Sequence, residues 1–172
     1  MFTLKSSAFG NEKKIPEKYA EKNRVSPPLS WDNPPKGTKS FALAVTDVDV
    51  PAAMNFPRVF VQWMVCNIPA TTKNLPEGAS PAGKLPSGAV DLNSDAVTSF
   101  KMPGHGKGYT GPWPPDAAHR YVFTLYALKT ESLSIPPEAD YIEFVKAVLP
   151  QTIAMATLIG IYGPAKTPLP TG

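Results

Sequence analysis

The residues best suited to chemistry are one imidazole and one carboxylate that lie far apart in the 172-residue chain. His119, one of two histidines, follows a proline-rich loop and precedes an aromatic run that is typical of a strand. Asp47 lies at the end of an earlier apolar run. A carboxylate beside an imidazole stabilises the imidazolium, which with the Tyr121 hydroxyl and the Gly111 backbone would bind an anion. The residues alone also allow a purely structural hydrogen bond between Asp47 and His119.

A catalytic interpretation is the alternative from a different class of protein. Ser99, His119 and Asp47 could be combined as a serine hydrolase triad, but the chain has no Gly-x-Ser-x-Gly motif. Two histidines and scattered carboxylates lack the spacing of metal ligands. No phosphate-binding Gly-x-x-x-x-Gly-Lys-Ser/Thr loop is present. We therefore expect no catalytic activity and no cofactor.

Strands must position these residues, because the apolar runs around them have the composition and periodicity of β structure. The patterns predict strands over residues 2–6, 40–49, 60–68, 88–92, 121–128 and 156–162, and one helix over 138–149. The 60–68 run is apolar nearly throughout, so we expect a central strand that is covered on both faces. Side chains two apart in a strand share a face, which places Asp47 and Asp49 on the same side.

The fold class follows from proline content and strand count. The 21 prolines are incompatible with a helical bundle and favour short strands joined by shaped loops. The longest segment without clear periodicity, residues 70–118, is expected to be functional or flexible. We predict a mostly β protein with a two-sheet antiparallel β core, one late helix and long Pro/Gly-rich loops. It should form a single domain over 1–172, with a loose C-terminal tail over 164–172.

Charge and composition restrict the classes of partner and the cellular location that we expect. The formal net charge is +3, with eight Lys and Arg against four Asp and Glu in residues 1–40. No basic run with interleaved aromatics occurs, so we expect a solvated face and no nucleic acid partner. Cys66 is the single cysteine, which excludes an internal disulfide and suits a core position. No secretory signal and no transmembrane segment is recognisable, so the expected location is cytoplasmic.

Residues 109–128, YTGPWPPDAAHRYVFTLYAL, resemble the signature of the phosphatidylethanolamine-binding protein family, in particular its bacterial and archaeal Raf kinase inhibitor-like branch. Further similar motifs follow in the family's order. They are SPPL at 26–29 with Trp31, GTKSFAL at 37–43, DVDVP at 47–51, Trp63 with NIP at 67–69, and A-x-L-x-G-x-Y at 156–162. The resemblance covers about residues 7 to 163 and implies the family's β fold.

The resemblance also implies a function. Members of this family bind phosphate, acetate or a phospholipid headgroup in a small pocket, without catalysis. The matching positions here are Asp47, Gly111, His119 and Tyr121, with Pro51 on the rim, while Asp49 would bond the loop through Arg120. The alternative is inhibition of a protease or kinase through the same loop face, since family members have such roles. A homodimer is possible.

Two departures from the family pattern lie in the expected pocket. Gln62 stands where the family has a second pocket histidine; its amide could still donate to an anion, but it cannot become cationic. Trp113 stands where the family has Cys or Gly, so its indole could fill the pocket, wall it off or donate through Nε1–H. Both departures are expected to weaken the binding of anions.

Overall fold

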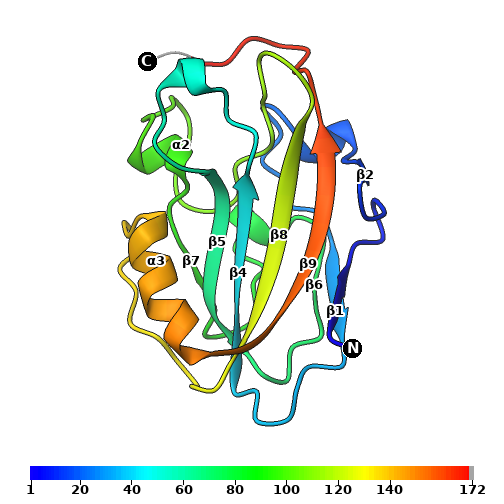
Figure 1. The fold of residues 1–172 in the computed structure, drawn as a ribbon, viewed down its shortest axis with the longest axis vertical. Coiled ribbons are helices and arrows are strands. Elements are labelled where there is room, and N and C mark those ends of the chain that lie inside the picture. Colours follow the sequence, from blue (N-terminus) through cyan, green and yellow to red (C-terminus); the bar gives the residue numbers. More distant parts are fainter. Residues whose placement is uncertain (171–172) are drawn as a thin grey trace.

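A computed structural model describes residues 1–170 and contains two β-sheets and three short helices (Figure 1). The strands are β1 Thr3–Lys5, β2 Lys13–Lys14, β3 Leu29–Asp32, β4 Ser40–Asp47, β5 Phe60–Pro69, β6 Asn74–Leu75, β7 Val90–Asp91, β8 His119–Leu128 and β9 Thr152–Tyr162. The helices are α1 Ala79–Ala82, α2 Asp95–Thr98 and α3 Tyr141–Val148, with 3-10 turns over Glu17–Tyr19, Ala52–Met54 and Leu149–Gln151. The mostly β, two-sheet prediction is confirmed.

The larger sheet has six strands in the order β2-β9-β8-β4-β5-β7, and the smaller has three in the order β1-β3-β6. All neighbours pair antiparallel except β2, which pairs parallel to β9. In the register of the large sheet, Asp47 lies opposite Tyr121, and His119 lies opposite Tyr162. The C-terminal end of β4 and the N-terminal end of β8 therefore meet at one edge of the molecule, as the predicted pairing of Asp47 with His119 requires.

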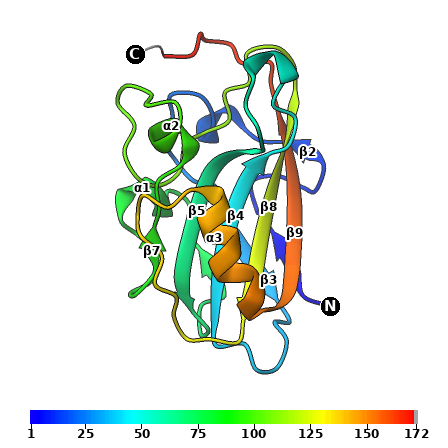
Figure 2. The same cartoon turned by 60° about the vertical axis from the view of Figure 1, so that its left-hand side comes forward.

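Two apolar layers cover the two faces of the large sheet. Along β4, Phe41, Leu43 and Val45 face the small sheet, whereas Ala42 and Ala44 pack with Phe144 and Val148 of α3. Figure 2 shows α3 lying across the large sheet. The central strand β5 is buried on both faces, as its apolar run predicts. Cys66 belongs to the α3 layer, and burial raises the pKa of its thiol to about 11.

The one long helix begins later than its sequence pattern indicates. The prediction began at residue 138, but α3 starts at Tyr141 because Asp140 is its N-cap. The Asp140 carboxylate accepts the Glu143 N–H at 2.8 Å, and the Glu143 carboxylate accepts the Asp140 N–H at 3.4 Å. This capping box satisfies two backbone donors that would otherwise lack a partner. Within residues 1–170, no helix has the length and apolar character needed to cross a bilayer.

Strand boundaries differ from the predictions where the site is built. β8 begins at His119 rather than at Tyr121, and β9 begins at Thr152 rather than at residue 156. β4 ends at Asp47 rather than at residue 49, because the Asp47 carboxylate accepts the N–H of Asp49 at 2.9 Å and turns the chain. Extended-chain periodicity therefore does not reach Asp49. The 70–118 segment contains β6, α1, β7 and α2, of which the sequence pattern predicted only a strand near β7.

Candidate functional site

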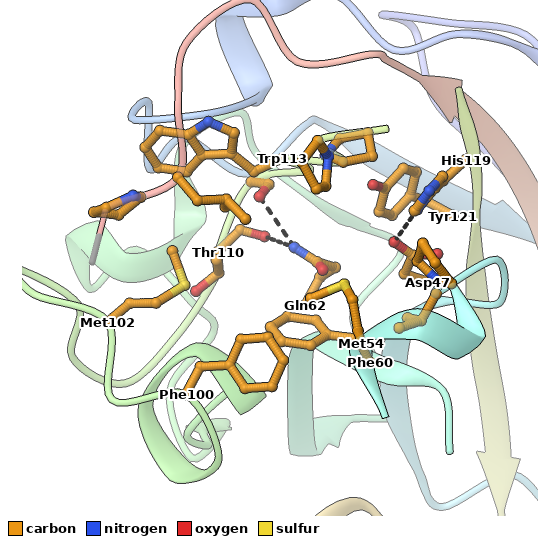
Figure 3. Close-up of a pocket in the computed structure, with 17 residues that line it drawn as sticks. Asp47, Met54, Phe60, Gln62, Phe100, Met102, Thr110, Trp113, His119 and Tyr121 are labelled. Atoms are coloured by element: carbon orange, nitrogen blue, oxygen red, sulfur yellow. Dashed lines mark hydrogen bonds and ion pairs between the residues drawn. The ribbon is translucent and has the colours of Figure 1, made fainter. Parts of the chain in front are cut away.

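The candidate site is a pocket of about 480 Å³ at the edge where β4 ends and β8 begins. All seven residues singled out in the sequence line it: Asp47, Pro51, Gln62, Gly111, Trp113, His119 and Tyr121. They come from β4, the connection between β4 and β5, β5, β8 and the loop before β8. Figure 3 shows Asp47, His119 and Tyr121 at one end, Phe100, Met102 and Trp113 at the other, and Gln62 between them.

His119 is buried and holds a carboxylate on each ring nitrogen. Nδ1 bonds Asp47 Oδ2 at 2.7 Å, and Nε2 bonds Asp116 Oδ1 at 2.8 Å. Burial disfavours the imidazolium, but the hydrogen bond and charge of Asp47, followed by those of Asp116, outweigh it and raise the pKa of His119. A ring that donates to carboxylates from both nitrogens must be protonated, so this geometry and the raised pKa favour the imidazolium form of His119.

Asp116 was missed by the sequence analysis. Its backbone lies in the loop before β8, and its side chain remains 47% exposed although it bonds His119. Desolvation opposes its ionisation, but the His119 hydrogen bond and the loop's N–H groups outweigh this and lower the pKa of Asp116. The available signal was a carboxylate three residues before the imidazole. Asp116 thus occupies the Nε2 position of the His119 ring.

Tyr121 completes the polar end of the pocket. Its ring stacks on His119, with centroids 6.4 Å apart and planes 24° apart. Burial first, and then the charge of Asp47 and a hydrogen bond to it, raise the pKa of the Tyr121 hydroxyl. The phenol therefore keeps its proton and remains a hydrogen-bond donor at this end of the pocket.

Gln62 holds the loop that forms the pocket wall. Its Nε2 donates to the backbone carbonyl oxygens of Thr110 at 2.8 Å and Gly111 at 3.0 Å, and the Thr110 N–H donates to the backbone carbonyl oxygen of Gln62 at 2.9 Å. Two carbonyl acceptors fix the amide orientation and use both of its N–H groups. The expectation that this amide donates to an anion is therefore wrong, because the loop backbone already accepts both protons.

Comparison with known proteins identifies the family of this chain. The family model described as phosphatidylethanolamine-binding protein matches residues 5–163. The chain belongs to this family. A "UPF0098 protein" from Methanothermobacter thermautotrophicus is 38% identical over 160 residues, which are 92% of this chain and 97% of the relative.

Solved structures of phosphatidylethanolamine-binding protein homologs have the same fold. The Chlamydia trachomatis homolog CT736 superposes with a TM-score of 0.80 at 34% identity, covering 95% of this chain and 97% of the homolog. Escherichia coli YbcL also gives a TM-score of 0.80, at 30% identity, with coverage of 95% and 98%. The family assignment expected from the sequence motifs is thus confirmed.

Within this family fold, Trp113 takes a role that the sequence could not settle. The indole lines the pocket and does not fill it, and its Nε1–H donates to the Thr167 carbonyl at 2.9 Å. Thr167 lies in the C-terminal strap, residues 163–170, which crosses the pocket edge of the molecule (Figure 1). Leu169 and Pro170 of the strap line the same pocket. Trp113 thus connects the strap to the pocket wall.

The prediction of a loose C-terminal tail is wrong for residues 165–167. The buried carboxylate of Glu21 accepts the N–H groups of Lys166 at 3.0 Å and Thr167 at 2.9 Å, and also the hydroxyls of Thr167 and Tyr162. The Ala165 N–H donates to Pro114 O at 2.7 Å. Residues 171–172 lie outside the described part. Glu21 and Lys166 are 145 positions apart in the chain. No local sequence pattern could therefore have predicted this contact.

We predict that Glu21→Gln loosens the strap. Burial disfavours the Glu21 charge, but hydrogen bonds from Lys166, Thr167 and Tyr162 outweigh it and lower the pKa to about 2. The pKa of Glu21 in the folded protein lies below the usual value near 4.5. The stability that the ionised Glu21 carboxylate contributes is therefore fully present above pH 4.5 and is lost as pH falls towards 2. Amide exchange at Lys166 and Thr167 should accelerate at least tenfold in Glu21→Gln at pH 7, since bonds to a charged acceptor are lost.

The matched control for the strap is Glu138→Gln, which removes a carboxylate from the loop before α3. Its exchange rates at Lys166 and Thr167 should equal those of the native chain. Equal rates in Glu21→Gln and in the native chain would show that the carboxylate does not hold the strap.

Two further sequence hypotheses are resolved by hydrogen bonds. Arg120 donates to Asp49 through Nε at 2.8 Å and Nη2 at 2.7 Å, as the resemblance implied, and this bond is the main cause that lowers the pKa of Asp49 to about 2. Asp47 and Asp49 therefore have separate partners.

The Ser99 hydroxyl donates to Asp95 at 2.7 Å. Ser99 thus has no bond to His119, and the imagined triad does not form.

Gly111 lies where the pocket loop passes close to another segment. A Cβ on Gly111 would lie 2.8 Å from the Tyr19 carbonyl oxygen and 2.9 Å from the Ala20 Cα. These are backbone atoms, which cannot rotate away as a side chain could. Glycine is therefore required for the close approach of the loop to the Tyr19–Ala20 backbone.

Proposed function

We propose that this protein is a non-catalytic binding protein that holds a small anion or a phosphorylated headgroup at His119. The observation that supports it most directly is that His119 lines an open pocket while its Nε2 bonds a half-exposed carboxylate, that of Asp116, which is not itself part of the pocket lining. A carboxylate oxygen and a phosphate oxygen accept the same charge-assisted hydrogen bond. Asp116 thus stands where the oxygen of a ligand would bind.

The two aspartates have different parts in this proposal. Asp47 is buried and fixed, since it also accepts the Asp49 N–H, so it keeps His119 oriented and charged. Asp116 is carried by a loop and its side chain is 47% exposed, so it can leave Nε2 without a buried charge being stranded. An anion would therefore exchange with Asp116 and not with Asp47.

We predict that Asp116→Asn binds inorganic phosphate about tenfold more tightly than the native chain. The substitution removes a like charge next to the ligand and replaces a charged competitor for Nε2 with a weaker, neutral acceptor. Isothermal calorimetry at pH 6 measures the two dissociation constants. Binding in both proteins should weaken as pH rises through the raised pKa of His119, because the neutral ring loses one donor.

Asp32→Asn is the matched control, because it changes the net charge by the same amount on β3, away from the pocket lining. Its affinity for phosphate should remain within about twofold of the native value, since surface charges are screened. If neither the native chain nor Asp116→Asn binds phosphate at millimolar concentration, the proposed function is wrong. Equal gains in Asp116→Asn and Asp32→Asn would mean that net charge, and not the Nε2 donor, determines binding.

A further inference from the structure

We infer that the pocket selects a small hydrophobic acid rather than a bare headgroup, an inference that rests on the proposed function. The anionic end of the ligand would bind at His119, and its apolar body would lie in the rest of the pocket, here called the apolar chamber. The chamber is lined by Val50, Met54, Phe60, Phe100, Met102 and Leu169.

The chamber is larger than an anionic group. Phosphate has five heavy atoms and would occupy roughly 150 Å³, if each takes about the 30 Å³ of a liquid water molecule. The pocket measures about 480 Å³, so more than half of it would stay filled with water around a bare phosphate. Pockets of this size normally enclose a whole small organic molecule.

The walls of the chamber offer apolar surface. Phe60 and Phe100 pack edge to face, with centroids 5.0 Å apart and planes at 65°. Met54 and Phe100 are 38% and 37% exposed, so both present apolar surface to solvent at the pocket. Methionine and aromatic side chains adapt to ligand shape and favour aryl or alkyl groups. A ligand body placed here would remove this surface from water.

The polar groups around the chamber are already paired within the protein. Both N–H groups of Gln62 are taken by the carbonyls of Thr110 and Gly111, and the Thr110 hydroxyl bonds Ser94 Oγ at 2.8 Å. The Trp113 N–H is taken by the strap. These donors therefore need no hydrogen-bond acceptor from a ligand, and an apolar group can lie against them without leaving a polar group unsatisfied. Asp47 and His119, which both line the pocket, lie together at one end of it (Figure 3).

The experiment measures binding of inorganic phosphate and of methyl, butyl and phenyl phosphate by calorimetry at pH 6. All four ligands share one head, so differences report the apolar body. We expect affinity to rise about fourfold for each methylene between the methyl and butyl esters, and phenyl phosphate to bind at least tenfold more tightly than methyl phosphate. In the Phe100→Gln variant, affinity should depend much less on the size of the ester group.

The control variant is Ile142→Gln, which changes a similarly exposed apolar side chain on α3, outside the chamber. It should keep the full dependence on the ester group. If the native chain binds phosphate but binds the butyl and phenyl esters no more tightly, the inference is wrong while the proposed function stands. An unchanged series in Phe100→Gln would also overturn it. If the native chain binds none of the four ligands, the proposed function itself fails.

Discussion

Replacing Asp47 by alanine should abolish phosphate binding and lower the free energy of unfolding by about 3 kcal/mol at pH 6. Asp47 and His119 are both buried and bond at 2.7 Å. Removing the carboxylate strands a buried imidazolium, which then keeps only the exposed partner Asp116. The ring would release its proton and lose the donor that an anion needs. Urea unfolding and calorimetry with phosphate measure the two effects.

The pH dependence of this effect distinguishes a charge effect from lost packing. The pKa of His119 is raised in the folded state, so the stability it contributes is fully present below the unfolded value of about 6.5 and is lost as pH rises through the folded pKa. The difference in unfolding free energy between native and Asp47→Ala should therefore shrink from pH 6 to pH 9. A difference that stays constant over this range would contradict the charged state of His119. Asp47→Asn keeps the shape and removes the charge, so it should show an intermediate loss.

The second large effect is expected from Asp95→Ala, which should cost about 4 kcal/mol of folding free energy. The Asp95 side chain is 2% exposed and accepts two bonds from Arg58, at 2.7 and 3.0 Å, and one from the Val61 N–H at 2.8 Å. Its loss leaves the Arg58 guanidinium, itself 19% exposed, without its partner. Breaking one side of a buried pair is far more costly than replacing both. Urea denaturation measures the change.

A double-mutant cycle tests the cause of that loss. Arg58→Ala with Asp95→Ala should cost clearly less than the sum of the single changes, because neither partner is then stranded. Additive costs would show that the two side chains act independently. Asp95 also begins α2, and the segment that follows carries Phe100 and Met102 into the pocket. Native-like single variants of Asp95 should therefore also bind phenyl phosphate more weakly.

Much of the site could be predicted because strand periodicity and family motifs are local properties of the chain. Asp47 and His119 end and begin apolar runs that pair in the large sheet, so their meeting follows from antiparallel register. The resemblance placed Gly111 and Tyr121 beside them, and all line the pocket. The apolar residues Phe100 and Met102 could not be assigned, because they lie in a segment without periodicity.

By itself the sequence determined the family, the mostly β architecture and the set of backbone positions that surround the pocket, because these depend on hydrophobic spacing and on motifs of neighbouring residues. Only the tertiary structure decided which partner each polar group takes. The Gln62 amide donates hydrogen bonds to the pocket loop, Asp116 bonds His119 Nε2, and the Trp113 indole donates to the strap. A donor bonds the acceptor that lies within about 3 Å in the right direction, and that depends on how segments distant in the chain are packed together.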